Sequence, residues 1–238
     1  MFCIQVLSIA LLIAGISAGE ERIIGGQRAE LGQFPHQVFI YFVNPKNETF
    51  ICGGSIIDEE WILTAAHCTS GFIRAIVVAG SVDHSSKLNP RQLTNDIALL
   101  HLTGKLSYTE NIKPAVLLVD NHQSFHGQTV TASGFGKTAD TVPPSNYLMY
   151  TDMKVIGPLQ CSLTFPFLID NTKICTGTKG PHSTCQGDSG GPLVLKGTNH
   201  VIGLTSFGSS KGCEKELPTV YTRVSAHKKY IEKHVGPL

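Results

Sequence analysis

A glycine-rich run near the C-terminal end constrains this chain more than any other feature. Residues 184–192 read Thr-Cys-Gln-Gly-Asp-Ser-Gly-Gly-Pro. Because glycine has no side chain, a serine flanked by glycines lies where the backbone can approach a ligand closely. Ser189, at the centre of the run, is therefore our candidate nucleophile.

The order of the partners of this serine separates two interpretations of the motif. Gly-x-Ser-x-Gly is also typical of the α/β-hydrolases, which place an acid and then a histidine after the serine. No aspartate follows Ser189, whereas His67 stands upstream in Leu-Thr-Ala-Ala-His-Cys and Asp96 in Asn-Asp-Ile-Ala-Leu-Leu. The order His, Asp, Ser is that of the chymotrypsin arrangement.

With these three motifs, and with Ile-Ile-Gly-Gly after Arg22, the chain resembles the chymotrypsin-like serine peptidases from about Arg22 to the C-terminus. The resemblance implies an all-β fold of two six-stranded antiparallel Greek-key barrels, with the active site between them and a short C-terminal helix. It also implies a serine endopeptidase that acts on proteins or peptides, needs no metal or organic cofactor and is bound by protein protease inhibitors.

Each candidate catalytic residue has a role in that chemistry. A serine hydroxyl is a weak nucleophile, so His67 would take the proton of Ser189 during attack and return it to the leaving amine. Asp96 would hold the imidazole in one tautomer and stabilise its charged form. The backbone N–H groups of Gly187 and Ser189 would bind the oxyanion, and water would then release the acyl-enzyme.

The resemblance also assigns a specificity pocket. Ser183, six positions before the nucleophile, would form its floor, where a trypsin-like enzyme has an aspartate that pairs with Lys or Arg. Gly208 would leave the mouth open and Thr219 would project into the depth, so we expect uncharged apolar side chains such as Leu, Met or Phe. Ser206, Phe207 and Gly208 would bind the substrate main chain as an added strand.

The N-terminal segment carries two processing signals. Residues 4–16 form an apolar run followed by Ser-Ala, so residues 1–18 are interpreted as a secretory signal peptide, with a retained membrane anchor as the alternative. Residues 19–22 would be an activation propeptide, cut after Arg22 by a trypsin-like protease, ahead of a peptidase domain at 23–238. The new ammonium group of Ile23 would then be buried against Asp188 and would order the oxyanion hole.

Removal of the signal peptide takes Cys3 away and leaves six cysteines. An even number in a secreted chain predicts disulfides, but six cysteines allow fifteen pairings. The resemblance implies the pairs Cys52–Cys68, Cys161–Cys175 and Cys185–Cys213. A formal charge of +1 provides no basic field for nucleic acid, and the default expectation is an extracellular monomer with no membrane contact.

Short apolar runs divided by turn residues predict the strands. They lie at 37–43, 50–57, 72–80, 129–133, 147–155, 193–196, 200–206 and 219–224, and a helix capped by Ser225 is expected at 226–234. Asn47-Glu48-Thr49 is a candidate glycosylation site in a turn. His122 and His126 have the spacing of helical metal ligands but no third ligand, so no metal site is expected.

One interval departs from the family pattern, because Asp96 follows His67 by only 29 positions. The family has a further strand and turn between Gly80 and Asn95. The segment spans up to roughly 50 Å when extended, so Asp96 can still reach His67. We expect a first barrel that lacks a strand and exposes two edges, unless the sequence derives from an incomplete gene model. The rival hypothesis is an impaired secreted homologue that acts as a binding protein.

Overall fold

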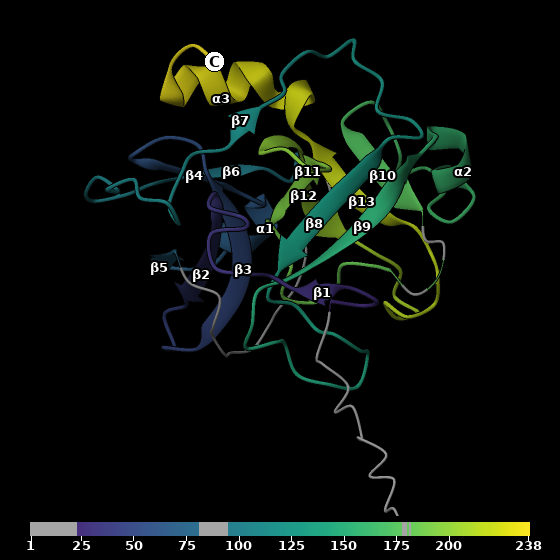
Figure 1. Cartoon of the computed structure of the whole chain (residues 1–238), viewed down its shortest axis with the longest axis horizontal. Coiled ribbons are helices and arrows are strands. Elements are labelled where there is room, and N and C mark those ends of the chain that lie inside the picture. Colours follow the sequence, from purple (N-terminus) through teal and green to yellow (C-terminus); the bar gives the residue numbers. More distant parts are fainter. Residues whose placement is uncertain (1–22, 81–94, 178–179, 181) are drawn as a thin grey trace, which may run out of the picture.

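The protein consists of two β-sheet units with a helix at the C-terminal end (Figure 1). A computed structural model describes residues 23–80, 95–177, 180 and 182–238. The expected signal peptide, the propeptide and Arg22 lie outside these ranges, as does the interval 81–94.

The C-terminal unit is a closed six-stranded antiparallel barrel, as the resemblance implies. Neighbouring strands follow the order β8-β9-β10-β13-β12-β11, and β11 pairs with β8 to close the ring. The strands are β8 (Thr129–Gly134), β9 (Met149–Ile156), β10 (Lys173–Gly177), β11 (Pro192–Leu195), β12 (His200–Phe207) and β13 (Thr219–Arg223). Two short strands, β1 (Gln27–Arg28) and β7 (Val116–Leu117), add to β9 and β12 from outside the ring.

The N-terminal unit is an open five-stranded half-barrel. Its strands are β2 (Gln37–Val43), β3 (Thr49–Ile56), β4 (Trp61–Thr64), β5 (Arg74–Ala79) and β6 (Ala98–His101). They follow the order β5-β2-β3-β4-β6, so within the described ranges β5 and β6 each have one neighbour. The half-barrel agrees with the expectation that the first barrel lacks a strand, as far as the described residues go, since the interval 81–94 lies outside them.

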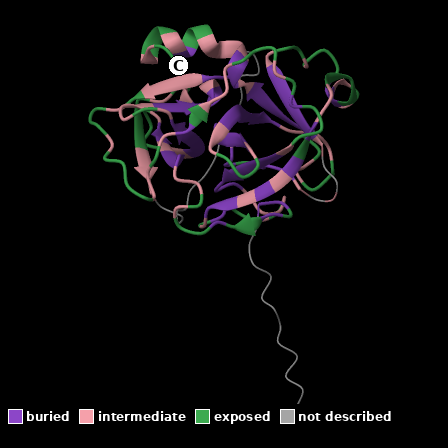
Figure 2. Ribbon diagram, turned by 45° about the horizontal axis from the view of Figure 1, so that its top comes forward, coloured by how far each residue is buried: buried purple, intermediate pink, exposed green. Residues whose placement is uncertain are grey.

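Strands of the closed barrel are more buried than the edge strand β5 of the half-barrel (Figure 2). Seven of the eight residues of β12 are buried, whereas none of β5 is. Ile76 in β5 is 47% exposed and Ile73 just before it is 72% exposed. Missing neighbours on the open side therefore leave apolar surface in water, which lowers the contribution of these residues to stability.

Apolar side chains from both units pack together between them. One cluster joins Leu63 and Ile97 of the half-barrel to Val194 and Leu204 of the barrel. The backbones also meet, because Gly53 N–H donates a hydrogen bond to Ser189 O at 2.8 Å. The open unit is thus held against the closed one at the point where the sequence motifs gather.

The C-terminal helix begins later than predicted. A 3-10 turn, η1 (Val224–His227), precedes α3 (Lys228–Val235). Ser225 lies inside η1 and caps nothing; its hydroxyl instead accepts a hydrogen bond from Arg223 Nε at 2.9 Å, so the predicted cap is wrong. Ile231 is fully buried and holds α3 on the body of the protein.

The structure pairs Cys52 with Cys68, Cys161 with Cys175, and Cys185 with Cys213, as the resemblance implies. The second pair anchors α2 (Pro158–Ser162), a short helix that was not predicted, to β10. None of the helices in the described ranges has the length and apolar character needed to cross a membrane.

Candidate active site

His67 and Asp96 meet in the half-barrel. His67 lies on α1 (Ala66–Thr69), directly after β4, and Asp96 lies just before β6, the strand that pairs with β4. His67 Nδ1 is 2.8 Å from Asp96 Oδ2, and His67 N–H donates to Asp96 Oδ1 at 2.9 Å. Because the carboxylate is an acceptor, it favours a proton on Nδ1 and leaves Nε2 as the free acceptor of the neutral ring.

Two further hydrogen bonds to Asp96 come from the closed barrel. Ser206 Oγ donates to Asp96 Oδ2 at 2.6 Å, and Thr222 Oγ1 donates to the backbone oxygen of Asp96 at 2.8 Å. The sequence analysis expected Ser206 only beside the substrate main chain and did not single out Thr222. No local motif marks either role, because these residues follow Asp96 by 110 and 126 positions.

The turn that carries Ser189 depends on glycine. Asp188 N–H donates to Cys185 O at 3.1 Å and Gly191 N–H to Asp188 O at 2.9 Å. Gly187 has φ 105° and Gly190 has φ 76°, a region that side chains rarely adopt. Neither Gly187 N–H nor Ser189 N–H donates a hydrogen bond within the described ranges, so both remain available to a ligand.

The glycines also allow the two units to approach each other. A Cβ atom on Gly190 would collide with Thr64 Oγ1 and lie 2.7 Å from Gly53 O. A Cβ atom on Gly53 would lie 2.8 Å from Gly191 Cα. The sequence predicts glycines that let a ligand approach, and the structure shows that the same glycines let two segments of the protein approach each other.

One cavity of about 210 Å³ brings the sequence-predicted residues together. His67 and Ser189 line it, as do the predicted pocket and main-chain residues Ser183, Ser206, Phe207, Gly208 and Thr219. Ser189 Oγ has no hydrogen bond to His67 within the described residues; in unliganded proteases this contact often tightens only with substrate bound. Other lining residues, among them Gly212, Leu217 and Pro218, carry no motif that predicts them from the sequence.

The cavity lining around Ser183 and Thr219 is polar and uncharged. Ser183 Oγ donates to Thr184 O at 2.9 Å and lies 3.0 Å from Thr219 Oγ1, so the two hydroxyls satisfy each other. His67 is the only ionisable side chain among the described residues of the lining, since both of its cysteines are in a disulfide. The cavity therefore offers no carboxylate to a Lys or Arg side chain.

Asp188 is completely buried behind the serine turn. Its carboxylate accepts Gly136 N–H at 2.7 Å and Cys185 N–H at 2.9 Å. Burial raises the pKa of Asp188 to about 7, although these two hydrogen bonds act in the opposite direction. Ile23 is also completely buried, and Ile24 O accepts a hydrogen bond from Ser183 N–H at 3.3 Å.

The other candidate positions lie on the surface. Asn47 is exposed in the turn before β3, and His122 and His126 are exposed in the loop before β8.

Two groups of metal-ligand residue types occur in the described ranges, Cys52 with His67 and Cys68, and Asp140 with Cys185 and Cys213. Each group contains a disulfide, whose sulfur atoms are not the thiolates that metal ions bind.

A closed barrel beside a half-barrel, with the His, Asp and Ser motifs gathered at their junction, defines the class of chymotrypsin-like serine proteases. A family model described as Trypsin matches residues 23–231, and the chain belongs to this family. It is a serine endopeptidase, and protein substrates and protease inhibitors are the partners of such an enzyme.

Named relatives agree with this assignment. Serine protease 1 of Drosophila melanogaster is 36% identical, with 90% of this chain and 86% of the relative covered. Collagenase of Hypoderma lineatum is 35% identical, with 91% and 88% covered, and brachyurin of Leptuca pugilator is 31% identical, with 90% and 99% covered. A solved structure of HL collagenase superposes with a TM-score of 0.82 at 33% identity, over 91% of this chain and all of that one.

Proposed function

We propose that this endopeptidase is secreted and that His67, Asp96 and Ser189 carry its chemistry. The observation that carries the proposal is the buried His67–Asp96 hydrogen bond at the edge of the cavity that Ser189 also lines. A base held by a carboxylate and sharing a cavity with a serine is the arrangement that activates a hydroxyl for attack on a carbonyl.

The reaction proceeds by general base and then general acid catalysis. His67 Nε2 takes the proton of Ser189 Oγ as this oxygen attacks the peptide carbonyl, and Asp96 stabilises the resulting imidazolium. The negative oxygen of the intermediate binds the free N–H groups of Gly187 and Ser189. His67 then gives its proton to the leaving amine, and a water molecule repeats the sequence to release the acyl group.

The pocket prefers uncharged apolar P1 side chains. A floor made of the mutually bonded Ser183 and Thr219 hydroxyls supports this preference, because a Lys or Arg side chain would be buried there without a counter-charge. Gly208 leaves room at the mouth, since a Cβ atom there would meet nothing within 4 Å. We expect Leu, Met and Phe esters to be cleaved in preference to Arg esters; a preference for Arg would refute this specificity.

The enzyme is made as a monomeric zymogen that a trypsin-like protease cuts after Arg22. The support is the carboxyl group of Asp188, which is buried, forms no ion pair with the described residues and has its pKa raised to about 7. An ammonium group created at Ile23 would give this carboxyl group the opposite charge that a buried ion requires. Ser206, Phe207 and Gly208, at the end of β12, would hold the substrate main chain.

The open half-barrel favours a second candidate, an impaired homologue that binds partners without hydrolysis. An open sheet constrains its loops less well than a closed one, and a displacement of about 1 Å can cost about a hundredfold in rate. Against this stands the network around Asp96, in which Ser206 of the closed barrel fixes the carboxylate of the open one. We therefore prefer the catalytic proposal.

Labelling with a fluorophosphonate probe, before and after trypsin treatment, tests both candidates. The proposal predicts that Ser189 is labelled only after the cut, and that Ser189→Ala and Arg22→Gln each abolish labelling. Rapid labelling of the uncut chain would refute zymogen control. Folded, cut protein that is not labelled would support the binding homologue.

A further inference from the structure

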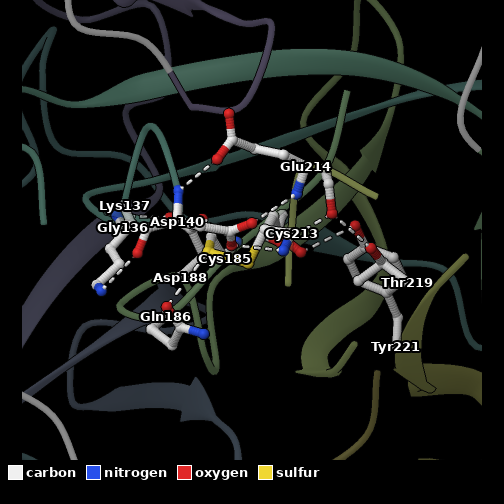
Figure 3. The surroundings of a disulfide bond; sticks show 12 residues. Gly136, Lys137, Asp140, Cys185, Gln186, Asp188, Cys213, Glu214, Thr219 and Tyr221 are labelled. Atoms are coloured by element: carbon white, nitrogen blue, oxygen red, sulfur yellow. Dashed lines mark hydrogen bonds between the residues drawn. A yellow bond between two sulfur atoms is a disulfide. The ribbon is translucent and has the colours of Figure 1, made fainter. Parts of the chain in front are cut away.

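The loop after β8 is fastened to the turn that carries the candidate nucleophile. Gly136 N–H donates to Asp188 Oδ1 at 2.7 Å, and Lys137 N–H donates to Gln186 O at 2.9 Å. These two backbone hydrogen bonds hold the start of the loop on one side of the cavity. The loop then continues to Asp140, whose side chain lies beside the Cys185–Cys213 disulfide and bonds the backbone of Cys213, a residue of the cavity wall (Figure 3).

Asp140 and Glu214 form a reciprocal pair between the loop and this wall. Asp140 Oδ1 accepts Cys213 N–H at 2.7 Å, and its Oδ2 accepts Glu214 N–H at 3.4 Å. In return, Glu214 Oε2 accepts Asp140 N–H at 2.8 Å. All three bonds involve a carboxylate, and such bonds are roughly twice as strong as those between neutral groups.

The cavity wall at Gly212 and Cys213 has room for the carboxylate of Asp140 because residue 212 is a glycine. Gly212 has φ 118°, and a Cβ atom there would collide with the carboxylate of Asp140. Gly212 and Cys213 line the cavity, whereas Asp140 and Glu214 do not. Asp140 therefore acts on a bound ligand only through the position of the wall.

We propose that Asp140 is a positioning residue that sets the width of the specificity pocket by holding the Gly212–Cys213 wall. The inference rests on the proposed function, because it takes the cavity to be the P1 pocket. The Cys185–Cys213 disulfide ties the same wall to the serine turn. The Glu214 Oε2 bond to the backbone N–H of Asp140 is another tie, and the carboxylate of Asp140 adds two more, to Cys213 N–H and Glu214 N–H.

Asp140→Ala removes the two bonds that the carboxylate accepts and keeps the Glu214 bond to the backbone N–H of position 140, whereas Asp140→Asn keeps an oxygen that can accept Cys213 N–H. Asp58→Ala is the control, because Asp58 is an exposed aspartate that bonds Glu60 N–H within its own turn, away from the cavity. We measure kcat and KM separately on the cut protein, with Phe and Ala esters. Asp140→Ala should raise KM about tenfold for the Phe ester and about twofold for the Ala ester, with kcat nearly unchanged. For Asp140→Asn, the KM for the Phe ester should stay within about threefold of the KM of the unsubstituted protein.

A binding measurement keeps the inference separate from catalysis. In a Ser189→Ala background, indole serves as an uncharged aromatic probe of the pocket, and NMR titration gives its Kd with and without Asp140→Ala. We expect Kd to rise by about the same factor as KM for the Phe ester. This comparison holds even when the unchanged chain cleaves no ester, an outcome that refutes only the proposed function.

Three results would overturn the role of Asp140. The first is an equal loss on the Phe and Ala esters together with a lower thermal midpoint, which indicates a general structural role. The second is an unchanged KM and Kd in Asp140→Ala. The third is the absence of indole binding with either residue at position 140, since no apolar pocket would then exist for Asp140 to position.

Discussion

The two β units differ in closure, yet the candidate catalytic groups come from both. Ser189 and the cavity floor belong to the closed six-stranded barrel, whereas His67 and Asp96 belong to the five-stranded half-barrel. The half-barrel is most open at β5 and β6, the two strands with one neighbour each in the described ranges. Asp96 nevertheless lies directly before β6 and is completely buried.

Residues of one unit can therefore fix a candidate catalytic group that belongs to the other unit. Asp96 is fixed by Ser206 and Thr222 of the closed barrel as well as by His67. The one-sided pairing of β5 and β6 in the described part of the chain therefore coexists with an intact contact between Asp96 and His67. If the closed unit fixes the site and the open unit is less stable at its edge strands, substitutions in the two units should differ in their effects on activity and stability.

The largest effect is expected from Asp96→Asn. The same change in a comparable serine protease lowers kcat by about 10⁴, because the amide favours the wrong tautomer of the imidazole. We expect a loss of about that size in the cut protein, with little change in the unfolding midpoint, by ester hydrolysis and thermal melting. Asp120→Asn, at an exposed aspartate that bonds His122 N–H, is the control. A loss below about tenfold would mean that the half-barrel does not deliver the acid.

Replacing a β12 isoleucine of the closed barrel with alanine should lower the free energy of unfolding more than the same replacement in β5 of the half-barrel. Ile202→Ala in β12 removes a side chain that is 1% exposed, and should lower the free energy of unfolding by about 3 kcal/mol. Ile76→Ala in β5 removes one that is 47% exposed, and should cost under about 1 kcal/mol. Denaturant titration at constant pH measures both. Equal costs would contradict the open edge.

His36 should make the contact region between the units sensitive to acid. It precedes β2, is 1% exposed, and lines a cavity with Thr131 and Val194 of the closed barrel. Neither ring nitrogen has a hydrogen-bond partner within the described ranges. Burial lowers the pKa of His36 to about 4, from an ordinary value of 6.5.

Below pH 6.5 the unfolded chain binds a proton at His36 that the folded chain binds only below about pH 4. Stability therefore falls as the pH decreases through this window, by about 2 to 3 kcal/mol at pH 4.5. Denaturant titration at pH 7 and pH 4.5 measures the loss, and His36→Phe should remove this part of it. A variant that keeps the full loss would assign the acid sensitivity to other groups.

The smallest expected effect is a difference in amide hydrogen exchange between two strands, and it is measured without a mutation. Strand β8 pairs with β9 and β11, whereas β5 pairs with β2 alone in the described ranges. Alternate backbone N–H groups of β5 should therefore exchange faster with solvent than any of β8, as measured by hydrogen exchange and NMR. Equal protection would show that the β5 edge is covered by residues outside the described ranges or by a partner.

The sequence predicts most strands because apolar runs bounded by turn residues are local signals. The predicted runs 37–43, 129–133 and 219–224 differ from β2, β8 and β13 by at most one residue at either end. Strand β10, which completes the ring between β9 and β13, was missed, as were β4 and β6 of the half-barrel and the two-residue strands β1 and β7. Ser225 was misassigned as a cap because its hydrogen bond to Arg223 depends on where β13 ends.

Chain order and glycine content were sufficient to nominate His67, Asp96 and Ser189, whereas the open first barrel was predicted by comparing the 29-position spacing of His67 and Asp96 with the pattern of the resembling family. These features depend on residue type and spacing, which a linear sequence records directly. The support of Asp96 by Ser206 and Thr222, and of the pocket wall by Asp140, depends on contacts across 73 to 126 positions. Only the folded backbone brings such distant groups within hydrogen-bond distance, because a hydrogen bond requires a definite geometry that no local pattern encodes.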